Sequence, residues 1–380
     1  MKLECLSEKS VWFHAVSVGE VLSLQSLILR LKERNPDLSI YFSSLTSSGL
    51  RIAKEKLEGV DRFLFVPLDF AVVVRKFLRS LRPTVLVLAE SEFWPRLLKE
   101  AGSKTEGVLL INGRISARSF KRYFRFRFVF KHILGNVNHF IIQTDTEREY
   151  LTKIGISPRR LEVVGNLKTE IELPRFEDSE KTALKTKFSF SKSHKIVLAG
   201  STHKGEDERL IDAFSQARRE REDIDLILVP RHPARTDEIV RLLKGVPFEV
   251  WRRSEVQPES RWDILLLDTI GELAFLYALC DAAFIGGSLI PWGGQNFLEP
   301  AFYGKPIFFG PHMDNFQELA NRFIESGAAR VVESNEDLKR MFLLEDEQAL
   351  GVMGKKAEHL LASYQGITEK TLQRIERYLE

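Results

Sequence analysis

The chain has 380 residues, 44% of them hydrophobic and 29% charged, a composition that excludes a disordered or collagen-like protein. The 56 basic and 53 acidic side chains leave a net charge of +3, too little to indicate nucleic-acid binding by itself. Two cysteines exclude a disulfide framework and favour a reducing compartment. No stretch approaches about 18 consecutive apolar residues, so the sequence as given predicts no membrane-spanning helix. The length predicts two domains of roughly 150 residues each.

Short apolar runs alternate with amphipathic stretches in the first half of the chain. Six runs rich in β-branched and aromatic residues lack a period of two, as expected for parallel strands buried on both faces. They lie at residues 11–15, 39–43, 62–66, 84–89, 107–111 and 139–142. Helical patterns lie between some of them, at residues 19–34, 70–81 and 144–154. This alternation predicts right-handed βαβ units in a doubly wound sheet.

A charged and weakly periodic stretch at residues 171–193 interrupts this pattern, and we interpret it as a linker. Five further strand-like runs follow, at residues 195–199, 225–229, 263–267, 282–285 and 306–309, before charged helical sequence ends the chain. The sequence therefore predicts an α/β protein with two Rossmann-like domains, residues 1–170 and 194–380, whose parallel sheets face each other across a cleft. Ligands of such folds bind beside the carboxyl ends of the strands, so the loops there are the candidate sites.

Two of these loops carry carboxylates in the first half. Glu20 follows the first strand in the motif HAVSVGE and opens a helix, and Glu90 follows the fourth strand in the motif ESEFWP. A glutamate at the start of a helix can simply complement the helix dipole. A carboxylate at the wall of a cleft can instead take a proton from a hydroxyl nucleophile. Two carboxylates at the end of one strand, Glu90 and Glu92, are costly to bury without a function, which favours this second interpretation.

Loops of the second half are rich in glycine, hydroxyl groups and basic residues. The motif AGSTHKGE, which includes Ser201, offers backbone amides suited to a phosphate or carboxylate, although plain turns use such residues too. Pro230 and Arg231 end the next strand, where Arg231 can bind an anion or form only a surface ion pair. The richest stretch runs from FIGGS through GGQNFLEP to GPH, and its Glu299 lies where a carboxylate can accept both hydroxyls of a ribose.

These motifs, in their order, resemble those of the Kdo (3-deoxy-D-manno-octulosonic acid) transferases, glycosyltransferases of the two-Rossmann GT-B architecture that begin the inner core of lipopolysaccharide. The resemblance covers almost the whole chain through HAVSVGE, ESEFWP, NGRIS, GNLK, GSTHKGE, VPRHP, DTIGEL, FIGGS, NFLEP and GPH. The family usually begins with an apolar segment that anchors it in the membrane, whereas this sequence starts near the first strand. It also has Gln295 where histidine is common.

The resemblance implies an inverting enzyme that transfers Kdo from CMP-Kdo to a sugar hydroxyl of a lipid A precursor, with no metal or other cofactor. It implies that Glu20 is the general base and that Glu90 and Lys168 support the transition state. The implied CMP and donor site comprises Ser201, Pro230, Arg231, Ile270, Gly271, Glu272, Asn296, Phe297, Leu298 and Glu299. Lys168, Arg231 and the amides after Gly200 can stabilise the anionic leaving group without a metal ion.

A basic stretch interleaved with aromatic residues lies between Arg114 and Lys131. A solvated helix face with its aromatics turned to the core is the plainer interpretation. The aromatics exceed one buried stripe, however, which favours contact with an anionic membrane surface or a phosphorylated lipid acceptor. The expected contact residues are Arg118, Lys121, Arg122, Arg125 and Arg127. We therefore expect peripheral binding at the cytoplasmic face of the bacterial inner membrane. Nucleic acid is the competing partner, and nothing else in the chain favours it.

Other chemistries have less support in the sequence. The histidines are scattered, neither cysteine has a ligand-spaced partner, and Asp223-Ile224-Asp225, although spaced like a metal-binding motif, precedes its strand. His203 and His312 lie in loops at the cleft and are candidate contacts to the donor. Two alternatives stay open: another GT-B glycosyltransferase or nucleotide-sugar epimerase with a UDP-sugar donor, and an idle member that binds nucleotide or lipid in an assembly. The full set of candidate acid–base and donor residues counts against the idle member.

Overall fold

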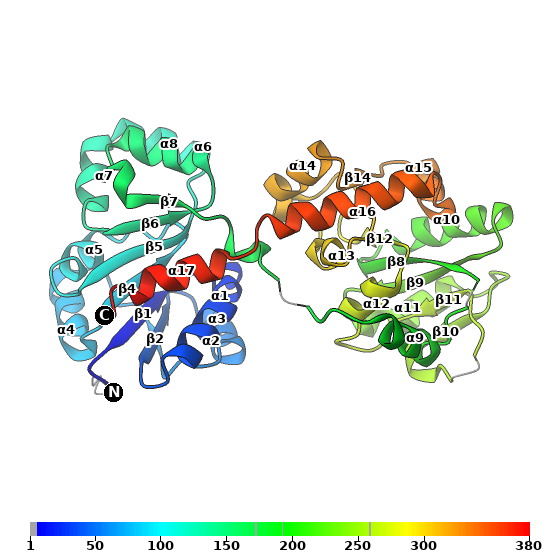
Figure 1. Ribbon diagram of the computed structural model, residues 1–380, viewed down its shortest axis with the longest axis horizontal. Coiled ribbons are helices and arrows are strands. Elements are labelled where there is room, and N and C mark those ends of the chain that lie inside the picture. Colours follow the sequence, from blue (N-terminus) through cyan, green and yellow to red (C-terminus); the bar gives the residue numbers. More distant parts are fainter. Residues whose placement is uncertain (1–5, 172, 192, 258–259) are drawn as a thin grey trace. The chain divides into compact units, whose positions relative to one another are not determined.

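The computed structural model describes residues 6–171, 173–191, 193–257 and 260–380. It divides into two α/β units (Figure 1). Unit 1 comprises Met1–Glu170 and Tyr364–Glu380, and unit 2 comprises Ile171–Ser363. Each unit holds one sheet of seven strands, and the strand pairs are parallel. The predicted α/β class with two Rossmann-like domains is therefore confirmed.

The strands of unit 1 lie in the order β3-β2-β1-β4-β5-β6-β7. They are β1 (Ser10–His14), β2 (Ser39–Ser44), β3 (Arg62–Phe65), β4 (Val85–Ala89), β5 (Gly107–Gly113), β6 (His139–Ile142) and β7 (Leu161–Val163). The helices are α1 (Val18–Ser23), α2 (Gln25–Arg34), α3 (Ser47–Lys56), α4 (Ala71–Leu81), α5 (Pro95–Ala101), α6 (Ala117–Arg125), α7 (Arg127–Leu134), α8 (Asp145–Ile154) and α17 (Ile367–Glu376).

Alternate side chains of these strands enter two separate cores, because successive residues of a strand point to opposite faces of the sheet. Val11 and Phe13 of β1 share a core with residues of α1, α2, α3 and α17. Trp12 between them lies in the other core, where its ring packs 5.0 Å from that of Phe77 in α4. Burial on both faces explains why the strands read as continuous apolar runs.

The last helix, α17, belongs to unit 1, whereas the sequence predicts a single domain over residues 194–380. Leu372 and Ile375 of α17 lie in a core of unit 1. The backbone N–H of Thr368 also donates to the carboxylate of Glu170 at 2.5 Å. An amphipathic pattern identifies the apolar face of a helix but not the sheet that receives it, which is why the domain assignment differs here.

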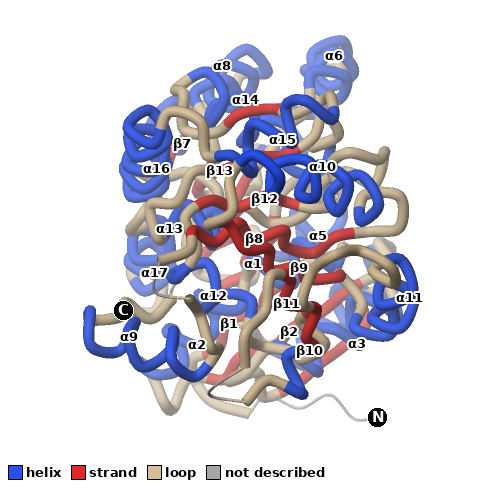
Figure 2. The backbone as a smooth tube through the Cα atoms, turned by 90° about the vertical axis from the view of Figure 1, so that its right-hand side faces the viewer, coloured by secondary structure: helices blue, strands red, loops and turns tan. Residues whose placement is uncertain are grey.

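The strands of unit 2 lie in the order β10-β11-β9-β8-β12-β13-β14, and Figure 2 shows β12, β8, β9 and β11 side by side. They are β8 (Lys195–Thr202), β9 (Ile224–Pro230), β10 (Val250–Arg252), β11 (Ile264–Leu266), β12 (Ala282–Ile285), β13 (Ile307–Phe309) and β14 (Arg330–Val331). The helices are α9 (Asp178–Lys187), α10 (Asp207–Glu220), α11 (Thr236–Leu242), α12 (Leu273–Leu279), α13 (Leu298–Phe302), α14 (Gln317–Glu325), α15 (Asn335–Leu343) and α16 (Glu347–Ala362). The expected linker at 171–193 thus contains α9, while its positions 172 and 192 lie outside the described residues.

Both sheets have a switch point beside their first strand, where the strand order reverses. In unit 1, β1 lies between β2 and β4, and in unit 2, β8 lies between β9 and β12. Loops that follow the strands flanking a switch point diverge and leave room for a ligand at the carboxyl edge. Glu20 follows β1 and Glu90 follows β4, while Glu206 follows β8 and Gly287 follows β12. The topology therefore positions the candidate residues of each unit.

Candidate active site

Glu20 lies in the first turn of α1, and its carboxylate is held by its own loop. The backbone N–H of Val16 donates to Oε2 at 2.8 Å, and the hydroxyl of Ser17 donates to Oε1 at 2.8 Å. Ser17 also caps the helix, because its hydroxyl oxygen accepts the N–H of Glu20. Glu20 is only 8% exposed. These contacts orient the carboxylate and still leave it lone pairs for one further donor.

Glu90 and Lys168 form an ion pair beside the loop of Glu20. Lys168 lies in the short 3₁₀ helix η2 (Leu167–Thr169), and its Nζ donates to Oε1 of Glu90 at 2.6 Å. A β-carbon on Gly19 would lie 3.6 Å from the same Nζ, so the ammonium group reaches the start of α1. Glu90 itself has φ 55°, an uncommon conformation for a residue other than glycine and one that clusters at functional sites. Three predicted catalytic residues therefore converge at this edge of the sheet.

Two further ionisable groups, Glu92 and His14, line this edge without a role predicted from the sequence. Burial raises the pKa of the Glu92 carboxyl, the hydrogen bond from Trp94 Nε1 opposes the rise, and the nearby Glu20 and Glu90 carboxylates add to it. Burial lowers the pKa of His14 to about 4. The neutral ring therefore forms no ion pair with Glu92 at neutral pH, although Nε2 lies 4.0 Å from Oε2. Glu92 belongs to the acidic loop after β4 that the sequence already indicates as functional, whereas for His14 its position at the carboxyl end of β1 is the signal that could have identified it.

In unit 2, one buried carboxylate gathers the loops that follow β8 and β12. Glu206 is 0% exposed, and its Oε2 accepts the backbone N–H groups of His203 at 2.9 Å and Gly287 at 2.6 Å. Its Oε1 accepts those of Ser288 and Leu289, both at 2.9 Å. Buried carboxylates that accept several N–H bonds are strongly held. The sequence predicts that the amides after Gly200 are open to an anion. For His203 this prediction is wrong, because its N–H already donates to Glu206.

Backbone lies directly against backbone around this carboxylate. A β-carbon on Gly286 would lie 2.3 Å from the carbonyl oxygen of Ser201, and one on Gly310 would lie 2.2 Å from that of Ser288. The hydroxyl of Ser288 accepts the N–H of Gly310 at 2.7 Å, so the loop after β13 is tied in as well. The glycines of FIGGS and GPH therefore allow a close approach that no side chain permits.

Basic and aromatic rings cluster beside these loops. His203 Nε2 lies 3.1 Å from Gln295 Nε2, and its ring centroid lies 4.9 Å from that of Trp292. Burial lowers the pKa of His203, and the charges of His232, Arg235 and Arg231 lower it further. The predicted donor residue Ser201, with φ 57°, lies next to the last residue of β8. Arg231, which is exposed, follows directly after β9. Arg235 is paired with the carboxylates of Asp207 and Glu238, whereas the exposed Arg231 side chain can bind an anion.

Of the predicted donor residues in and just before α13, only Asn296 and Glu299 have side chains that a ligand can reach. Phe297 and Leu298 are buried, as is Pro230 at the end of β9, so these three can offer a ligand only backbone groups. Asn296 is exposed, although its Oδ1 accepts the N–H of Leu298 at 3.0 Å. Glu299 is half-buried, and burial raises its pKa. Among the described residues Glu299 has no hydrogen-bond partner, which leaves its carboxylate available for a ligand.

The remaining predicted donor segment, Ile270 to Glu272, lies in the loop before α12. Ile270 is 88% exposed, and Gly271 has φ 90° with no atom within 4 Å of a β-carbon placed on it. The carboxylate of Glu272 accepts from the Thr269 hydroxyl and from Arg253 Nη2 at 3.3 Å. Glu272 therefore holds the loop, and the exposed tip is left free to contact a ligand.

The basic and aromatic stretch forms α6 and α7, and several of its aromatics point outward. The five predicted contact residues are exposed: Arg118, Lys121, Arg122, Arg125 and Arg127. Phe124, Phe126 and Phe128 are 41%, 56% and 78% exposed, whereas Tyr123 is buried. The guanidinium of Arg127 lies 4.9 Å from the ring centre of Phe128. The plainer interpretation, with the aromatics turned inward, therefore fits Tyr123 alone among these four. None of the described helices is long and apolar enough to cross a membrane.

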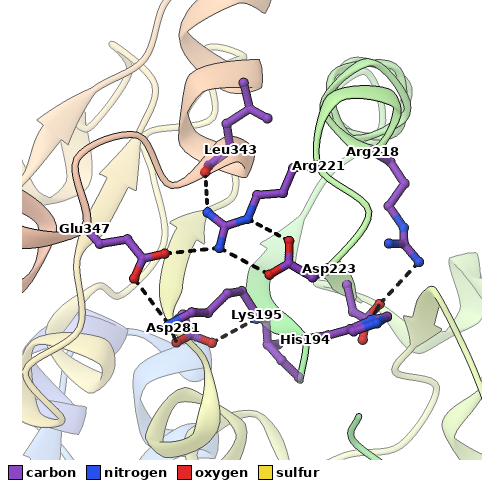
Figure 3. Close-up of polar contacts among 10 residues, drawn as sticks. His194, Lys195, Arg218, Arg221, Asp223, Asp281, Leu343 and Glu347 are labelled. Atoms are coloured by element: carbon purple, nitrogen blue, oxygen red, sulfur yellow. Dashed lines mark hydrogen bonds and ion pairs between the residues drawn. The ribbon is translucent and has the colours of Figure 1, made fainter. Parts of the chain in front are cut away.

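A charged network lies at the opposite, amino edge of the unit 2 sheet (Figure 3). It includes His194, whose Nδ1 lies 2.9 Å from the buried carboxylate of Asp225, and Arg221, which binds Asp223 and Glu347. The Asp223-Ile224-Asp225 motif is used here, away from the candidate donor loops. Among the described residues, no three or more His, Cys, Asp or Glu side chains are grouped to hold a metal ion.

Comparison with known proteins identifies the family. The family model for 3-deoxy-D-manno-octulosonic-acid transferase (kdotransferase) matches residues 2–171. The 3-deoxy-D-manno-octulosonic acid transferase of Haemophilus influenzae is 30% identical, over 99% of this chain and 88% of the relative. That of Rickettsia felis is 30% identical, over 97% and 79%. A bifunctional glycosyltransferase/methyltransferase of Fusobacterium nucleatum is 32% identical over 90% of this chain, which spans about half, 53%, of that relative's length.

Solved structures with low sequence identity share the fold. The UDP-GlcNAc 2-epimerase from Neisseria meningitidis, solved with UDP-GlcNAc bound, has a TM-score of 0.60 at 12% identity, covering 97% of this chain and 100% of the epimerase. MurG of Acinetobacter baumannii has the same TM-score and identity, covering 97% and 99%. At this identity the likeness shows the two-domain GT-B fold alone. The full-length sequence relatives go further, and this chain belongs to the 3-deoxy-D-manno-octulosonic acid (Kdo) transferases, a family of glycosyltransferases.

Proposed function

We propose that this protein transfers Kdo from CMP-Kdo to a sugar hydroxyl of a lipid A precursor, with inversion at the transferred centre and without a metal ion. The convergence of Glu20, Glu90 and Lys168 at the carboxyl edge of the unit 1 sheet carries the proposal. Acceptor activation is assigned to unit 1 and donor binding to unit 2. Membership of the family supports Kdo as the transferred sugar.

In the proposed reaction, Glu20 accepts the proton of the acceptor hydroxyl. The hydroxyl oxygen forms a bond to the anomeric carbon of Kdo as the bond between that carbon and the CMP phosphate breaks, and the electron pair leaves with CMP. One such displacement inverts the anomeric centre. The contacts from Val16 and Ser17 support this role, because a general base acts only within hydrogen-bond reach and in a fixed orientation.

Lys168 and the basic residues of unit 2 supply the positive charge that this reaction needs. Kdo carries a carboxylate, and CMP departs as a phosphate anion. We assign to the Lys168 ammonium, which Glu90 holds, the support of the donor carboxylate and of the charge that develops in the transition state. Arg231 in the basic cluster of unit 2 is assigned to the departing phosphate. Fixed protein charges thus take the part that a metal ion plays in other transferases.

The CMP moiety is assigned to the loops of unit 2. Glu299 has no hydrogen-bond partner among the described residues, and its carboxylate is proposed to accept hydrogen bonds from the ribose hydroxyls. Asn296 and the backbone of Phe297 and Leu298 lie beside it, and the exposed tip at Ile270 is proposed to cover the nucleotide.

The exposed basic side chains of α6 are proposed to bind the anionic surface of the membrane that holds the lipid acceptor. No acidic residue occurs between Glu106 and Asp145, so the positive charge of this helix is not offset within its own segment. Peripheral binding at the cytoplasmic face of the inner membrane follows as the proposed location.

The proposed function is tested by incubating the protein with CMP-Kdo and a tetraacylated lipid A precursor in detergent and reading the products by mass spectrometry. We expect a mass gain of whole Kdo units. Glu20→Gln, which keeps the shape of the side chain but removes its basicity, should lower the rate about 10²- to 10⁴-fold and leave CMP affinity unchanged. Glu55→Gln, at an exposed glutamate of α3, is the matched control and should retain full activity.

Either of two results would contradict the assignment. Near-normal transfer by Glu20→Gln would remove Glu20 from the role of base. Turnover of a UDP-sugar, with none of CMP-Kdo, would favour the alternative of a different GT-B transferase or an epimerase.

A further inference from the structure

An exposed apolar surface lies where β3 leads into α4. Leu68, Phe70 and Val72 are 64%, 67% and 78% exposed, and they lie within five residues of one another along the chain. The complete set, here called the β3–α4 surface, is Phe65, Leu68, Phe70, Val72 and Val73. So many large apolar side chains in one short exposed segment mark a site of contact with a protein or a membrane.

Packing of the fold already uses the opposite face of this segment. Val74, Leu78 and Leu81 of α4 are buried in the core that holds Trp12. The β3–α4 surface is therefore additional to the stripe that attaches α4 to its own sheet, and an amphipathic helix needs only one such stripe.

The segment is also held firmly in place. The carboxylate of Asp69 accepts the backbone N–H groups of Arg96 at 3.0 Å and Leu97 at 2.7 Å, at the start of α5. Asp69 thereby turns its charge inward, while Leu68 and Phe70 on either side of it point to solvent. The exposed apolar side chains are thus presented by a fixed turn.

Charge around the surface is positive. Asp69 is the only acidic residue between Asp61 and Glu90, and its carboxylate is used at α5. Lys76 and Arg79 of α4 are exposed. A fixed apolar surface bordered by positive charge matches the boundary between the hydrocarbon and the anionic headgroups of a membrane.

One helix, α5, connects the β3–α4 surface with the basic helices. Helix α4 packs against α5, and α5 packs against α7, as Figure 1 shows at the left of unit 1. The ring of Phe93, in the loop between β4 and α5, lies 5.9 Å from that of Tyr123 in α6. Helix α4 and the basic helix α7 therefore both pack against α5 in the same unit.

We propose that the β3–α4 surface inserts into the hydrocarbon boundary of a lipid bilayer while α6 binds the headgroups, an inference that rests on the proposed lipid acceptor. Two kinds of attachment result. Binding through α6 is electrostatic and weakens in salt, whereas insertion of the β3–α4 surface is hydrophobic and persists in salt.

Sedimentation with lipid vesicles tests the proposal. The wild-type protein should bind vesicles of phosphatidylcholine and phosphatidylglycerol, and part of this binding should persist at high salt. The Leu68→Ser/Phe70→Ser variant should lose that persistent part, with a partition coefficient at least about tenfold lower, because two large apolar side chains no longer enter the bilayer. Val352→Ser, at a 53% exposed valine of α16, is the matched control and should bind like the wild type.

Three outcomes would overturn the proposal. The Ser variant could bind as tightly as the wild type, or all wild-type binding could vanish at high salt. Self-association of the wild type in the absence of lipid, abolished by the variant, would show that a second copy covers the surface instead. Kdo transfer to a detergent-dispersed acceptor should be the same in the variant and the wild type. If the wild type fails to transfer Kdo, the proposed function is contradicted, but vesicle binding still tests the membrane surface independently.

Discussion

At the carboxyl edge of the unit 1 sheet, ionisable side chains from three loops face one another, whereas the same edge of unit 2 is filled by backbone groups gathered around a buried carboxylate. In unit 1, Glu90 pairs with Lys168 beside the loop of Glu20. In unit 2, Glu206 accepts four backbone N–H groups and reaches no solvent. The two sheets share a switch point beside their first strand, so this difference comes from the loops and not from the topology.

The difference matches the two tasks that we propose. Proton transfer needs side chains whose charge can change, and unit 1 supplies them. Binding of a nucleotide needs loops that keep their shape, and the shared carboxylate and close glycines of unit 2 supply that rigidity. Under this proposal a carboxylate has opposite roles in the two units: Glu20 would act on substrate in unit 1, whereas Glu206 holds the loops of unit 2.

Glu206→Gln is the strongest test of this comparison. Glutamine keeps one acceptor oxygen but turns its NH2 group toward N–H donors, so at least two buried donors lose their partner. We expect the free energy of unfolding of unit 2 to fall by about 3 kcal/mol or more. CMP affinity should fall at least tenfold, because His203 and the loop after β12 lose their shared anchor.

Thermal melting and calorimetric titration with CMP measure both effects. Glu208→Gln, at the exposed neighbour in α10, is the control and should change neither. Lower stability combined with wild-type CMP affinity would show that Glu206 holds the fold without shaping the donor loops. An unchanged melting temperature would contradict the role of the carboxylate altogether.

The amino edge of the unit 2 sheet gives a second test, because ion pairs between side chains connect its segments, whereas backbone N–H groups bind Glu206 at the carboxyl edge. Burial raises the pKa of the Asp225 carboxyl from 3.8 to about 6, and the hydrogen bond from His194 opposes the rise. The folded state then binds the proton more tightly than the unfolded state. The resulting stabilisation is complete below about pH 4 and is lost as the pH rises through 6, with a total of about 3 kcal/mol.

Asp225→Asn should remove this pH dependence. Denaturant unfolding between pH 4 and 7 should show the wild type losing stability relative to the variant as the pH rises. Asp212→Asn, at an exposed aspartate of α10, should follow the wild type. CMP affinity should be unaffected, because β9 separates the two edges by its seven residues, about 20 Å. A constant difference between wild type and Asp225→Asn across this range would contradict the assignment.

Much of the fold could be predicted from the sequence, because buried parallel strands read as apolar runs. The runs at residues 39–43 and 282–285 correspond to β2 and β12. The short edge strand β14 was not predicted, since two residues give no periodic signal. The placement of α17 was wrong by one unit, because an apolar stripe does not specify its receiving sheet.

The candidate site was predictable to the extent that its residues follow strands. The positions of Glu20 and Glu90 at the ends of β1 and β4 made their convergence foreseeable. Glu206 was missed, because its partners Gly287 and Ser288 are about eighty positions away and are backbone groups, which every residue possesses. Sequence patterns identify side chains well and the destination of a hydrogen bond poorly.

Glu299 gives the smallest and most specific test, because it is a carboxylate of unit 2 with no internal hydrogen-bond partner among the described residues. Glu299→Gln should weaken CMP binding about tenfold, the effect of losing one charge-assisted hydrogen bond. The melting temperature should be unchanged or slightly higher, since a half-buried carboxylate without a partner stabilises nothing.

Glu325→Gln, at an exposed glutamate of α14, is the control. Burial raises the pKa of Glu299, so wild-type CMP affinity should fall at a higher pH on acidification than an ordinary glutamate would allow, and this fall should be absent in Glu299→Gln. If Glu299→Gln instead melted like Glu206→Gln, both carboxylates would hold the fold, and the division of roles between the two edges would fail.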